Sequence, residues 1–185
     1  MQRVIRLPMY HQVSCKDTIK NTKDLFYYGH LTWLWTNSPL HREWSTKAQA
    51  RLIIPAIALK QFHLILNSDN LPVAYCSWAW LSQEKENEFI RRVGYIDPNS
   101  WNCGDRLWII DYISPFSLNY TRQLNEALAR KFPDKIARAL RVKPGNPKGK
   151  IISFRGPKLS IARKKNMNHD FTNQIEALIS SNIDK

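Results

Sequence analysis

The feature that most constrains the fold of this chain is a short apolar segment, residues 106–114 (RLWIIDYIS), which is followed by Pro115. Its length and its large apolar side chains are typical of a strand buried at the centre of a sheet. One acid, Asp111, lies inside the segment. Because a carboxylate is costly to bury unless it is paired or hydrogen-bonded, the sequence predicts a central strand in which this acid has a partner.

Two kinds of partner are open for Asp111. Arg106 or Arg138 could form a structural salt bridge with it, or a histidine could use the carboxylate to fix its tautomer and act as a base. His41 follows Ser-Pro-Leu, which predicts a turn, where functional groups are commonly displayed. Composition does not choose among the histidines, which are His11, His30, His41, His63 and His169.

The rest of the chain predicts alternating helices and strands. Helical spacing or composition predicts helices at 24–36, at 43–59 with an interruption at Pro55, and at 83–92, 118–132, 134–141 and 157–181. Strands are predicted at 61–66 and 72–81, as a hairpin, and at 106–114 and 149–154. We therefore expect an α+β or α/β domain with one central sheet, spanning residues 23–185 after an N-terminal extension of residues 1–22.

Positive charge is concentrated in one part of the sequence. Residues 130–165 contain thirteen Lys and Arg residues and one acid, Asp134, so nearly all of the net charge of +13 lies there. Such a block attracts an acidic partner, which could be a nucleic acid, an anionic membrane surface or an acidic protein.

Several function classes lack their usual motifs in this sequence. There is no G-x-S-x-G, G-x-x-x-x-G-K-[ST], G-x-G-x-x-G or H-E-x-x-H motif. The three cysteines, at 15, 76 and 103, have no metal-type spacing, which favours the reducing cytoplasm. Cys76 could be a nucleophile, but a small buried residue is the better interpretation. We expect no signal peptide and no membrane anchor, because no apolar run is long enough.

Two segments resemble a known family. Residues 29–44 (GHLTWLWTNSPLHREW) and 72–79 (PVAYCSWA) are similar to the lysine acyltransferases that activate RTX toxins. Further matches follow in the same order, at 104–106 (GDR), 110–116 (IDYISPF), 131–134 (KFPD), 138–142 (RALRV) and 149–150 (GK). The resemblance covers about residues 28–156.

This resemblance implies a fold, a reaction and a set of site residues. It implies a GNAT-like fold with a central mixed sheet flanked by helices, a homodimer, His41 and Asp111 as the catalytic pair, and Ser38 in a supporting role. The expected reaction moves a fatty acyl group from acyl carrier protein to internal lysines of an RTX protoxin, with no metal or bound cofactor. Because that carrier is acidic, the basic block could hold it, through Arg138, Arg141 and Lys150.

Alternatives remain open on the sequence alone. The resemblance implies a polar residue where this chain has Leu52, so a scaffold without catalysis is possible. The basic block would also suit a nucleic-acid-binding module, although no binding motif accompanies it. A third alternative is a GNAT enzyme that uses acetyl-CoA, but no glycine-rich R-x-x-G-x-G loop is present. Direct transfer is expected rather than an acyl-enzyme, because the sequence indicates no activated serine or cysteine.

Overall fold

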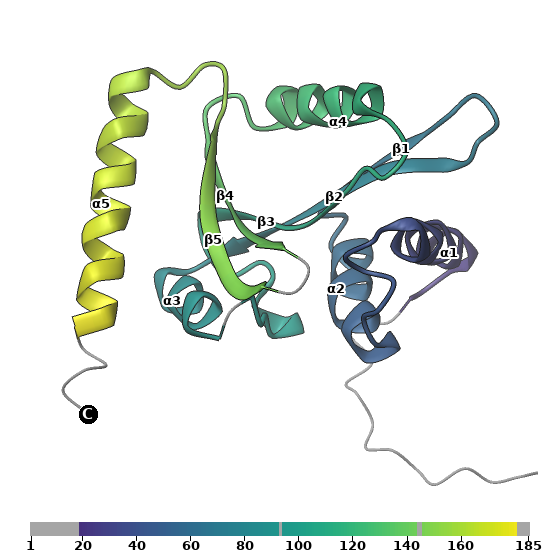
Figure 1. Cartoon of the computed structure of the whole chain (residues 1–185), viewed down its shortest axis with the longest axis horizontal. Coiled ribbons are helices and arrows are strands. Elements are labelled where there is room, and N and C mark those ends of the chain that lie inside the picture. Colours follow the sequence, from purple (N-terminus) through teal and green to yellow (C-terminus); the bar gives the residue numbers. More distant parts are fainter. Residues whose placement is uncertain (1–18, 93, 144–145, 181–185) are drawn as a thin grey trace, which may run out of the picture.

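The structure is a computed structural model, and it describes residues 19–92, 94–143 and 146–180. The helices are α1 (Thr22–Asn37), α2 (Thr46–Ala58), α3 (Gln83–Arg91), the 3-10 helix η2 (Pro98–Ser100), α4 (Leu118–Lys131) and α5 (Ile161–Ser180). The strands are β1 (Phe62–Leu66), β2 (Pro72–Leu81), β3 (Arg106–Ile113), β4 (Ile136–Lys143) and β5 (Asn146–Arg155). Figure 1 shows their arrangement.

The strands form one mixed sheet in the order β1-β2-β3-β4-β5. Neighbouring strands are antiparallel, except that β3 and β4 are parallel and are joined through α4. Helix α4 covers one face of the sheet, and α1, α2 and α3 lie on the other (Figure 1). This confirms the predicted α+β class with a central mixed sheet flanked by helices, an arrangement compatible with a GNAT-like fold.

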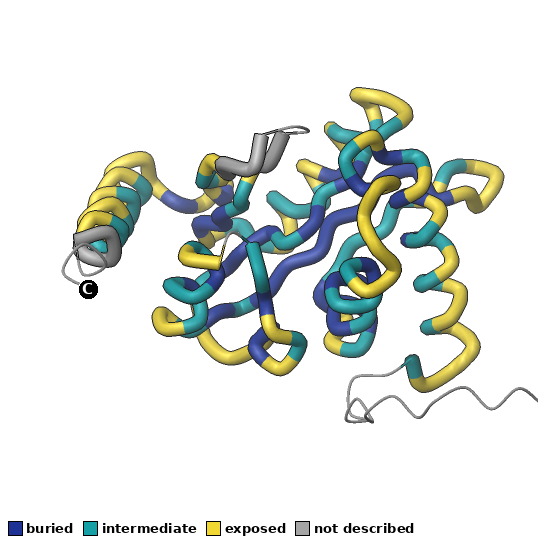
Figure 2. Tube along the Cα trace, turned by 60° about the horizontal axis from the view of Figure 1, so that its bottom comes forward, coloured by how far each residue is buried: buried dark blue, intermediate teal, exposed yellow. Residues whose placement is uncertain are grey.

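The sheet separates two apolar cores. The larger core lies on the side of α1, α2 and α3 and contains Trp35, Trp101 and Trp108, each at most 2% exposed. The smaller core lies beneath α4 and includes Trp78 and Leu124. Strands β2 and β3 are dark over most of their length in Figure 2, as expected for strands covered on both faces. The predicted central strand is therefore confirmed.

A β-bulge at Ile110 changes the direction of the next side chain. Ser77 pairs with Asp111 and Trp78 pairs with Ile109, so β3 has one more residue than β2 at this point. Ile109 packs in the core beneath α4, and strict alternation would send the side chain of Asp111 to that same face. The extra residue reverses this, and Asp111 instead contacts Trp35 of α1.

A gap opens in the sheet beside the bulge. Strands β3 and β4 pair only at 107–109 with 137–139, although β3 continues to Ile113 and β4 to Lys143. Beyond Ile109 and Ala139 the two strands are no longer hydrogen-bonded to each other. Side chains from both faces of the sheet can therefore meet in this gap.

Two predictions about individual elements were wrong. Residues 134–141 were expected to be helical, but residues 136–143 form β4 between β3 and β5. Alanine, leucine and arginine favour a helix in isolation, and here hydrogen bonding to two neighbouring strands overrides that preference. Helix α2 is not interrupted at Pro55, which lies within its last turn. Of the predicted extension, residues 1–18 lie outside the described residues, so it stays a prediction together with the 23–185 boundary.

Candidate active site

The turn that carries His41 is set by the end of α1. Pro39 has no N–H and restricts the residue before it to an extended backbone, so the helix ends at Asn37 and Ser38 adopts ψ 119°. The backbone N–H of His41 then donates to the carbonyl of Ser38 over 3.1 Å, and that of Trp44 donates to the carbonyl of His41 over 2.9 Å. His41 lies on a turn, as the sequence predicted.

His41 and Asp111 meet, although 70 positions separate them in the sequence. The Nε2 atom of His41 lies 2.9 Å from Oδ1 of Asp111, and both side chains are at most 5% exposed. On the other side of the ring, Nδ1 lies 2.6 Å from the hydroxyl of Ser38, which is also buried. The structure thus brings together all three residues that the resemblance placed in the catalytic centre.

Two tryptophans frame this centre and were not assigned a role from the sequence. Trp35 donates from Nε1 to Oδ2 of Asp111 over 3.0 Å, and its ring centroid lies 5.0 Å from that of His41. The Trp44 ring lies 4.7 Å from the His41 ring, at 61°. Both tryptophans belong to the W-L-W-x-x-S-P-L-H-x-x-W segment, so their spacing relative to His41 was the available signal.

The hydrogen bonds fix the protonation of neutral His41. A carboxylate only accepts hydrogen bonds, so Nε2 carries the proton and donates it to Asp111. The lone pair is then on Nδ1 and accepts from the Ser38 hydroxyl. If the ring takes a second proton, Nδ1–H can donate to the same hydroxyl, so the site satisfies both protonation states. The Ser38 hydroxyl thus donates to a basic ring nitrogen, a contact that the sequence did not indicate.

A cavity of about 430 Å³ opens onto this centre. It lies at the gap in the sheet, because Asp111 from β3 and Leu140 from β4 both line it, together with His41. On the α4 side it is lined by Thr121 and Asn125. Its volume is in the range of small-molecule sites. The paired imidazole and carboxylate thus face a space that a reacting group could occupy.

The three basic residues expected to contact a carrier protein differ in exposure. Arg141 is exposed and lines the cavity, and Lys150, also exposed, is its cross-strand neighbour on β5. Arg138 is 6% exposed, with its guanidinium 4.0 Å from the centre of the Phe171 ring. Its Nη2 donates to the carbonyl of Met167 over 3.3 Å. A surface contact with Arg138 is therefore disfavoured.

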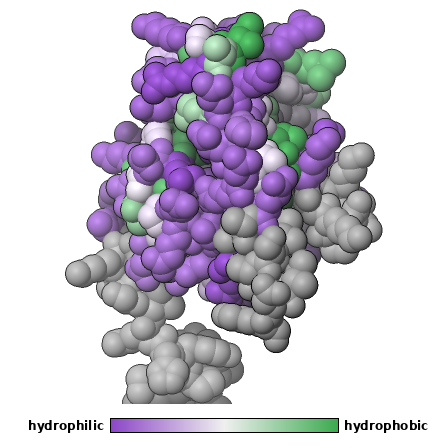
Figure 3. All heavy atoms as spheres, turned by 90° about the vertical axis from the view of Figure 1, so that its left-hand side faces the viewer, coloured by the Kyte–Doolittle hydropathy of each residue, from purple (hydrophilic) through white to green (hydrophobic). Residues whose placement is uncertain are grey.

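Arg138 and Arg106 do not pair with Asp111, which was the structural alternative for that acid. Their partner is Glu86, which is fully buried and lies 2.6 Å from Nη1 of Arg106 and 3.8 Å from Nη1 of Arg138. Glu86 also accepts from Nε1 of Trp108 and from the amide of Gln174 on α5. This cluster holds α5 against the domain. The side of the molecule that carries α5 is largely hydrophilic (Figure 3).

Two further residues singled out in the sequence are structural. Cys76 is fully buried beneath α4, and burial, followed by the charge of Asp111, raises the pKa of its thiol well above the ordinary value. A thiol held in its protonated form is a poor nucleophile, so Cys76 is a core residue. Leu52 is 6% exposed on α2 and does not line the cavity that holds His41. It lines a neighbouring hollow.

Neither metal clusters nor membrane spans were found in the part of the chain that the structure describes. Within residues 19–92, 94–143 and 146–180, no three or more His, Cys, Asp or Glu side chains are grouped so that they could hold a metal ion. No helix in the same ranges combines the length and the apolar character needed to cross a bilayer.

The residues of this site lie within the part of the chain that is similar to known proteins. The RTX toxin acyltransferase family matches residues 20–155, a range that contains both His41 and Asp111. The protein-lysine palmitoyltransferase CyaC of Bordetella bronchiseptica is 42% identical over 141 residues, which is 76% of each chain. The leukotoxin-activating lysine-acyltransferase LktC serotype A11 of Mannheimia haemolytica is 45% identical over 132 residues, 71% of this chain and 77% of that protein.

A further relative extends the match. The protein-lysine myristoyltransferase HlyC of Escherichia coli is 40% identical over 158 residues, 83% of this chain and 91% of that protein. The likeness thus covers most of the described residues and of the relatives themselves. On the family match and on these identities, the chain belongs to the RTX toxin acyltransferase family and is an acyltransferase.

Proposed function

We propose that this enzyme transfers a long-chain fatty acyl group from acyl carrier protein to lysine side chains of an RTX protoxin, with His41 as general base and Asp111 as its partner. The carrying observation is the 2.9 Å contact between His41 and Asp111 at the cavity in the sheet gap. The names of the relatives support the acceptor and the donor group, since they describe lysine palmitoyl- and myristoyltransferases that include toxin activators.

The reaction needs a base because the acceptor is protonated in water. A lysine amine has a pKa of about 10.4, so at neutral pH it is mostly the non-nucleophilic ammonium. The ammonium first loses one proton to solvent. As the resulting amine nitrogen bonds to the thioester carbon, a second proton passes from it through the Ser38 hydroxyl to Nδ1 of His41. The carbon–sulfur bond then breaks, and the leaving pantetheine thiolate takes that proton from the imidazolium. Asp111 stabilises the imidazolium through Nε2–H.

The two substrates approach from opposite faces of the sheet. The cavity at His41 adjoins the hollow lined by Arg51, Leu52 and Tyr95, and the two share Trp44, Ile110 and Leu140. That hollow lies on the side of α2 and α3, where the acceptor lysine would enter. Thr121 and Asn125 of α4 line the opposite side, where the donor thioester would lie.

The sharpest test is acyl transfer by His41→Ala with acyl carrier protein and an RTX protoxin, read by mass spectrometry of the protoxin. We expect a loss of about 100- to 10,000-fold, as for removal of a general base. His30→Ala is the matched control, because His30 lies on α1 and its ring nitrogen hydrogen-bonds to a backbone carbonyl, that of Phe26, instead of a carboxylate. Full activity of folded His41→Ala would refute the role of His41 as general base.

The hydrogen bond between Ser38 and His41 calls for a separate test of direct transfer. The wild-type enzyme is incubated with acyl carrier protein donor but no acceptor, and its intact mass is measured. Direct transfer predicts no mass increase, whereas an acyl group on Ser38 would add its mass to the wild type and not to Ser38→Ala. The second result would replace the relay through Ser38 by a covalent intermediate.

Arg141 and Lys150 are proposed to hold the acidic carrier at the mouth of the cavity. Arg141 contributes to the cavity lining, so a carrier docked there would present its thioester to His41. Arg141→Glu should raise KM for acyl carrier protein about 10-fold and leave kcat within about threefold, as expected when a steering charge is reversed. Arg163→Glu, an equal charge change at an exposed position on α5, is the control. Equal KM values for both variants would contradict this docking site.

A homodimer interface is proposed on one face of α1. The resemblance implies a homodimer, and Phe26 and Trp33, seven residues apart on one face of α1, are exposed by 66% and 51%. If this face forms the interface, Phe26→Glu should convert a dimer to a monomer in light scattering; an unchanged mass would exclude the face.

We place the reaction in the cytoplasm, consistent with the free thiols of Cys76 and Cys103.

A further inference from the structure

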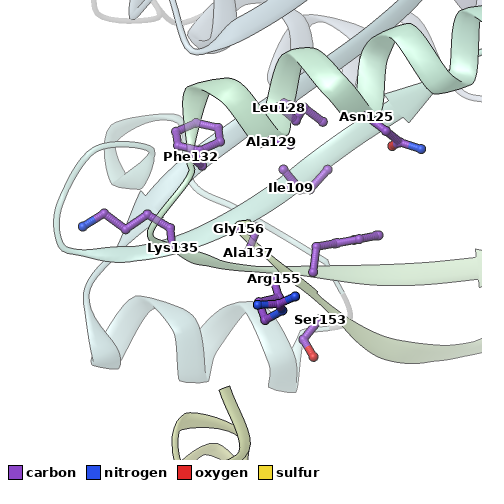
Figure 4. A pocket seen from close by; sticks show the side chains of 11 residues that line it. Ile109, Asn125, Leu128, Ala129, Phe132, Lys135, Ala137, Ser153, Arg155 and Gly156 are labelled. Atoms are coloured by element: carbon purple, nitrogen blue, oxygen red, sulfur yellow. The ribbon is translucent and has the colours of Figure 1, made fainter. Parts of the chain in front are cut away.

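A second cavity continues from the one at His41. It has a volume of about 390 Å³ and lies between α4 and the sheet. The two cavities share Ile109, Asn125 and Phe154 in their linings, so they are adjoining parts of one groove. Figure 4 shows Leu128 and Asn125 entering it from the helix and Ile109 from the strand below.

The groove is lined mostly by apolar residues, and it is hollow because small residues lie along it. Ala137 and Ala139 are two positions apart on β4, and both belong to the apolar core beneath α4. Ala139 lines the cavity at His41, and Ala137 lines the second cavity. Larger side chains at these positions would fill the space. Most of the remaining wall of the second cavity is apolar and includes Leu128 and Phe132, while Lys135, Ser153 and Arg155 add polar groups to it.

Packed side chains and backbone bound the second cavity around Phe132 and Gly156, at the end of α4. Phe132 makes edge contacts with the rings of Trp78 and Trp80, at 5.1 and 5.8 Å between centroids. Gly156 of the following segment donates to the carbonyl of Lys135, and a Cβ at Gly156 would meet the backbone of Phe132 at 2.3 Å. The loop before β4 and the end of β5 therefore form a fixed wall.

The length of the groove can be compared with an acyl chain. From Thr121, which lines the first cavity, to Phe132, which lines the second, the chain advances eleven residues, about 16 Å at a helical rise of 1.5 Å per residue. An extended chain of single bonds advances about 1.2 Å per bond, because the three backbone bonds of an extended residue span roughly 3.6 Å. The groove therefore accommodates about thirteen bonds.

We infer that this groove between α4 and the sheet binds the hydrocarbon tail of the donor acyl group and that its depth sets the preferred chain length. The inference rests on the proposed function, which places the thioester at His41. A channel that leads from the reacting centre, is lined mostly by apolar side chains and ends in a wall suits a saturated chain. Each buried methylene contributes about a fourfold gain in kcat/KM.

The test fills the groove at two depths. Ala137→Leu and Ala139→Leu are compared with the wild type by measuring kcat/KM for acyl carrier protein loaded with chains of about 6 to 18 carbons, a range that brackets the groove length. In both variants kcat/KM for the longest chains should fall by at least about 15-fold, which is the contribution of two methylenes, and kcat/KM for the shortest chains should stay within about threefold of the wild type. Because the two positions are about 6.6 Å apart, the cut-off for Ala139→Leu should be roughly five carbons shorter.

Controls separate this inference from the proposed function and from misfolding. Ala162→Leu adds the same atoms at an exposed position on α5 and should leave the chain-length profile unchanged. If Ala137→Leu does not fold, as judged by its thermal transition, Ala137→Val replaces it. A uniform loss across all chain lengths, or an unchanged profile in both variants, would overturn the tail site. Absence of transfer by the wild type with every chain would instead refute the proposed function.

Discussion

Replacing Asp111 with asparagine would test how the carboxylate controls His41 without changing its volume. The carboxylate accepts two hydrogen bonds, from Nε2 of His41 over 2.9 Å and from Nε1 of Trp35 over 3.0 Å. An amide has one oxygen, so only one of these donors keeps an acceptor. If the oxygen stays with Trp35, the amide N–H faces His41 and requires the lone pair on Nε2.

That change moves the proton of His41 to the wrong nitrogen. Nδ1 would then carry the proton and donate to the Ser38 hydroxyl, so no lone pair remains there to accept the proton from the amine. We expect kcat to fall by about 100- to 10,000-fold, the range for loss of a general base. At 1.36 kcal/mol for each factor of ten, this corresponds to a transition-state loss of about 2.7 to 5.4 kcal/mol.

The assay is single-turnover acyl transfer with saturating donor, together with thermal unfolding of the same samples. Asp69→Asn, in the exposed turn between β1 and β2, is the matched control. Asp111→Asn should melt near the wild-type temperature because the substitution is isosteric and removes a buried charge. A folded variant that retains more than about one third of the wild-type rate would refute the assigned tautomer and its role.

Three further predictions follow from buried or shifted groups. Glu86→Gln should leave Arg138 buried without its counter-charge and lower the free energy of unfolding by about 3 to 5 kcal/mol. This corresponds to a fall in Tm of roughly 6 to 20 °C, and a fall of less than about 2 °C would contradict the prediction. Cys76→Ala should keep activity, and in the native protein iodoacetamide should modify the exposed Cys103 but not Cys76, as checked by peptide mass spectrometry. The pKa of His63 is lowered below its ordinary 6.5 by burial and then by the charges of Lys131 and Arg130. The unfolded chain therefore binds a proton more readily than the folded protein does. The free energy of unfolding should fall as pH drops below about 6.5. His63→Gln should flatten this dependence in denaturant titrations, and an unchanged slope would contradict the assignment.

The sequence determined the secondary-structure elements that depend on neighbouring residues and the types of side chain in the candidate active site. Residues 106–114 formed the predicted buried strand, the 61–81 segment formed the predicted hairpin, and Ser38-Pro39 ended the first helix so that His41 lies on a turn. These features depend on neighbours in the chain, through backbone restriction by proline and the side-chain pattern of a strand. The apolar surroundings of Asp111 also indicated that this acid needs a partner. The sequence alone could not decide whether that partner is an arginine or a histidine.

Residues 134–141 show why the remaining elements could not be assigned from the sequence. Their alanine, leucine and arginine content favours a helix locally, and they form β4 only because β3 and β5 lie on either side. Arg138 was expected on a docking surface because of the family resemblance and the basic block, and nothing in its own segment indicates that it pairs in the interior with Glu86, 52 positions earlier.

The tertiary structure decided the site itself. The bulge at Ile110 turns Asp111 toward α1, and the separation of β3 from β4 opens the cavity that the pair faces. Both depend on hydrogen-bond register between strands, which is set by contacts far apart in the sequence. Ser38 follows the same division: its residue type was visible in the sequence, but its 2.6 Å contact with the His41 ring, which Asp111 holds from the other side, depends on the tertiary structure.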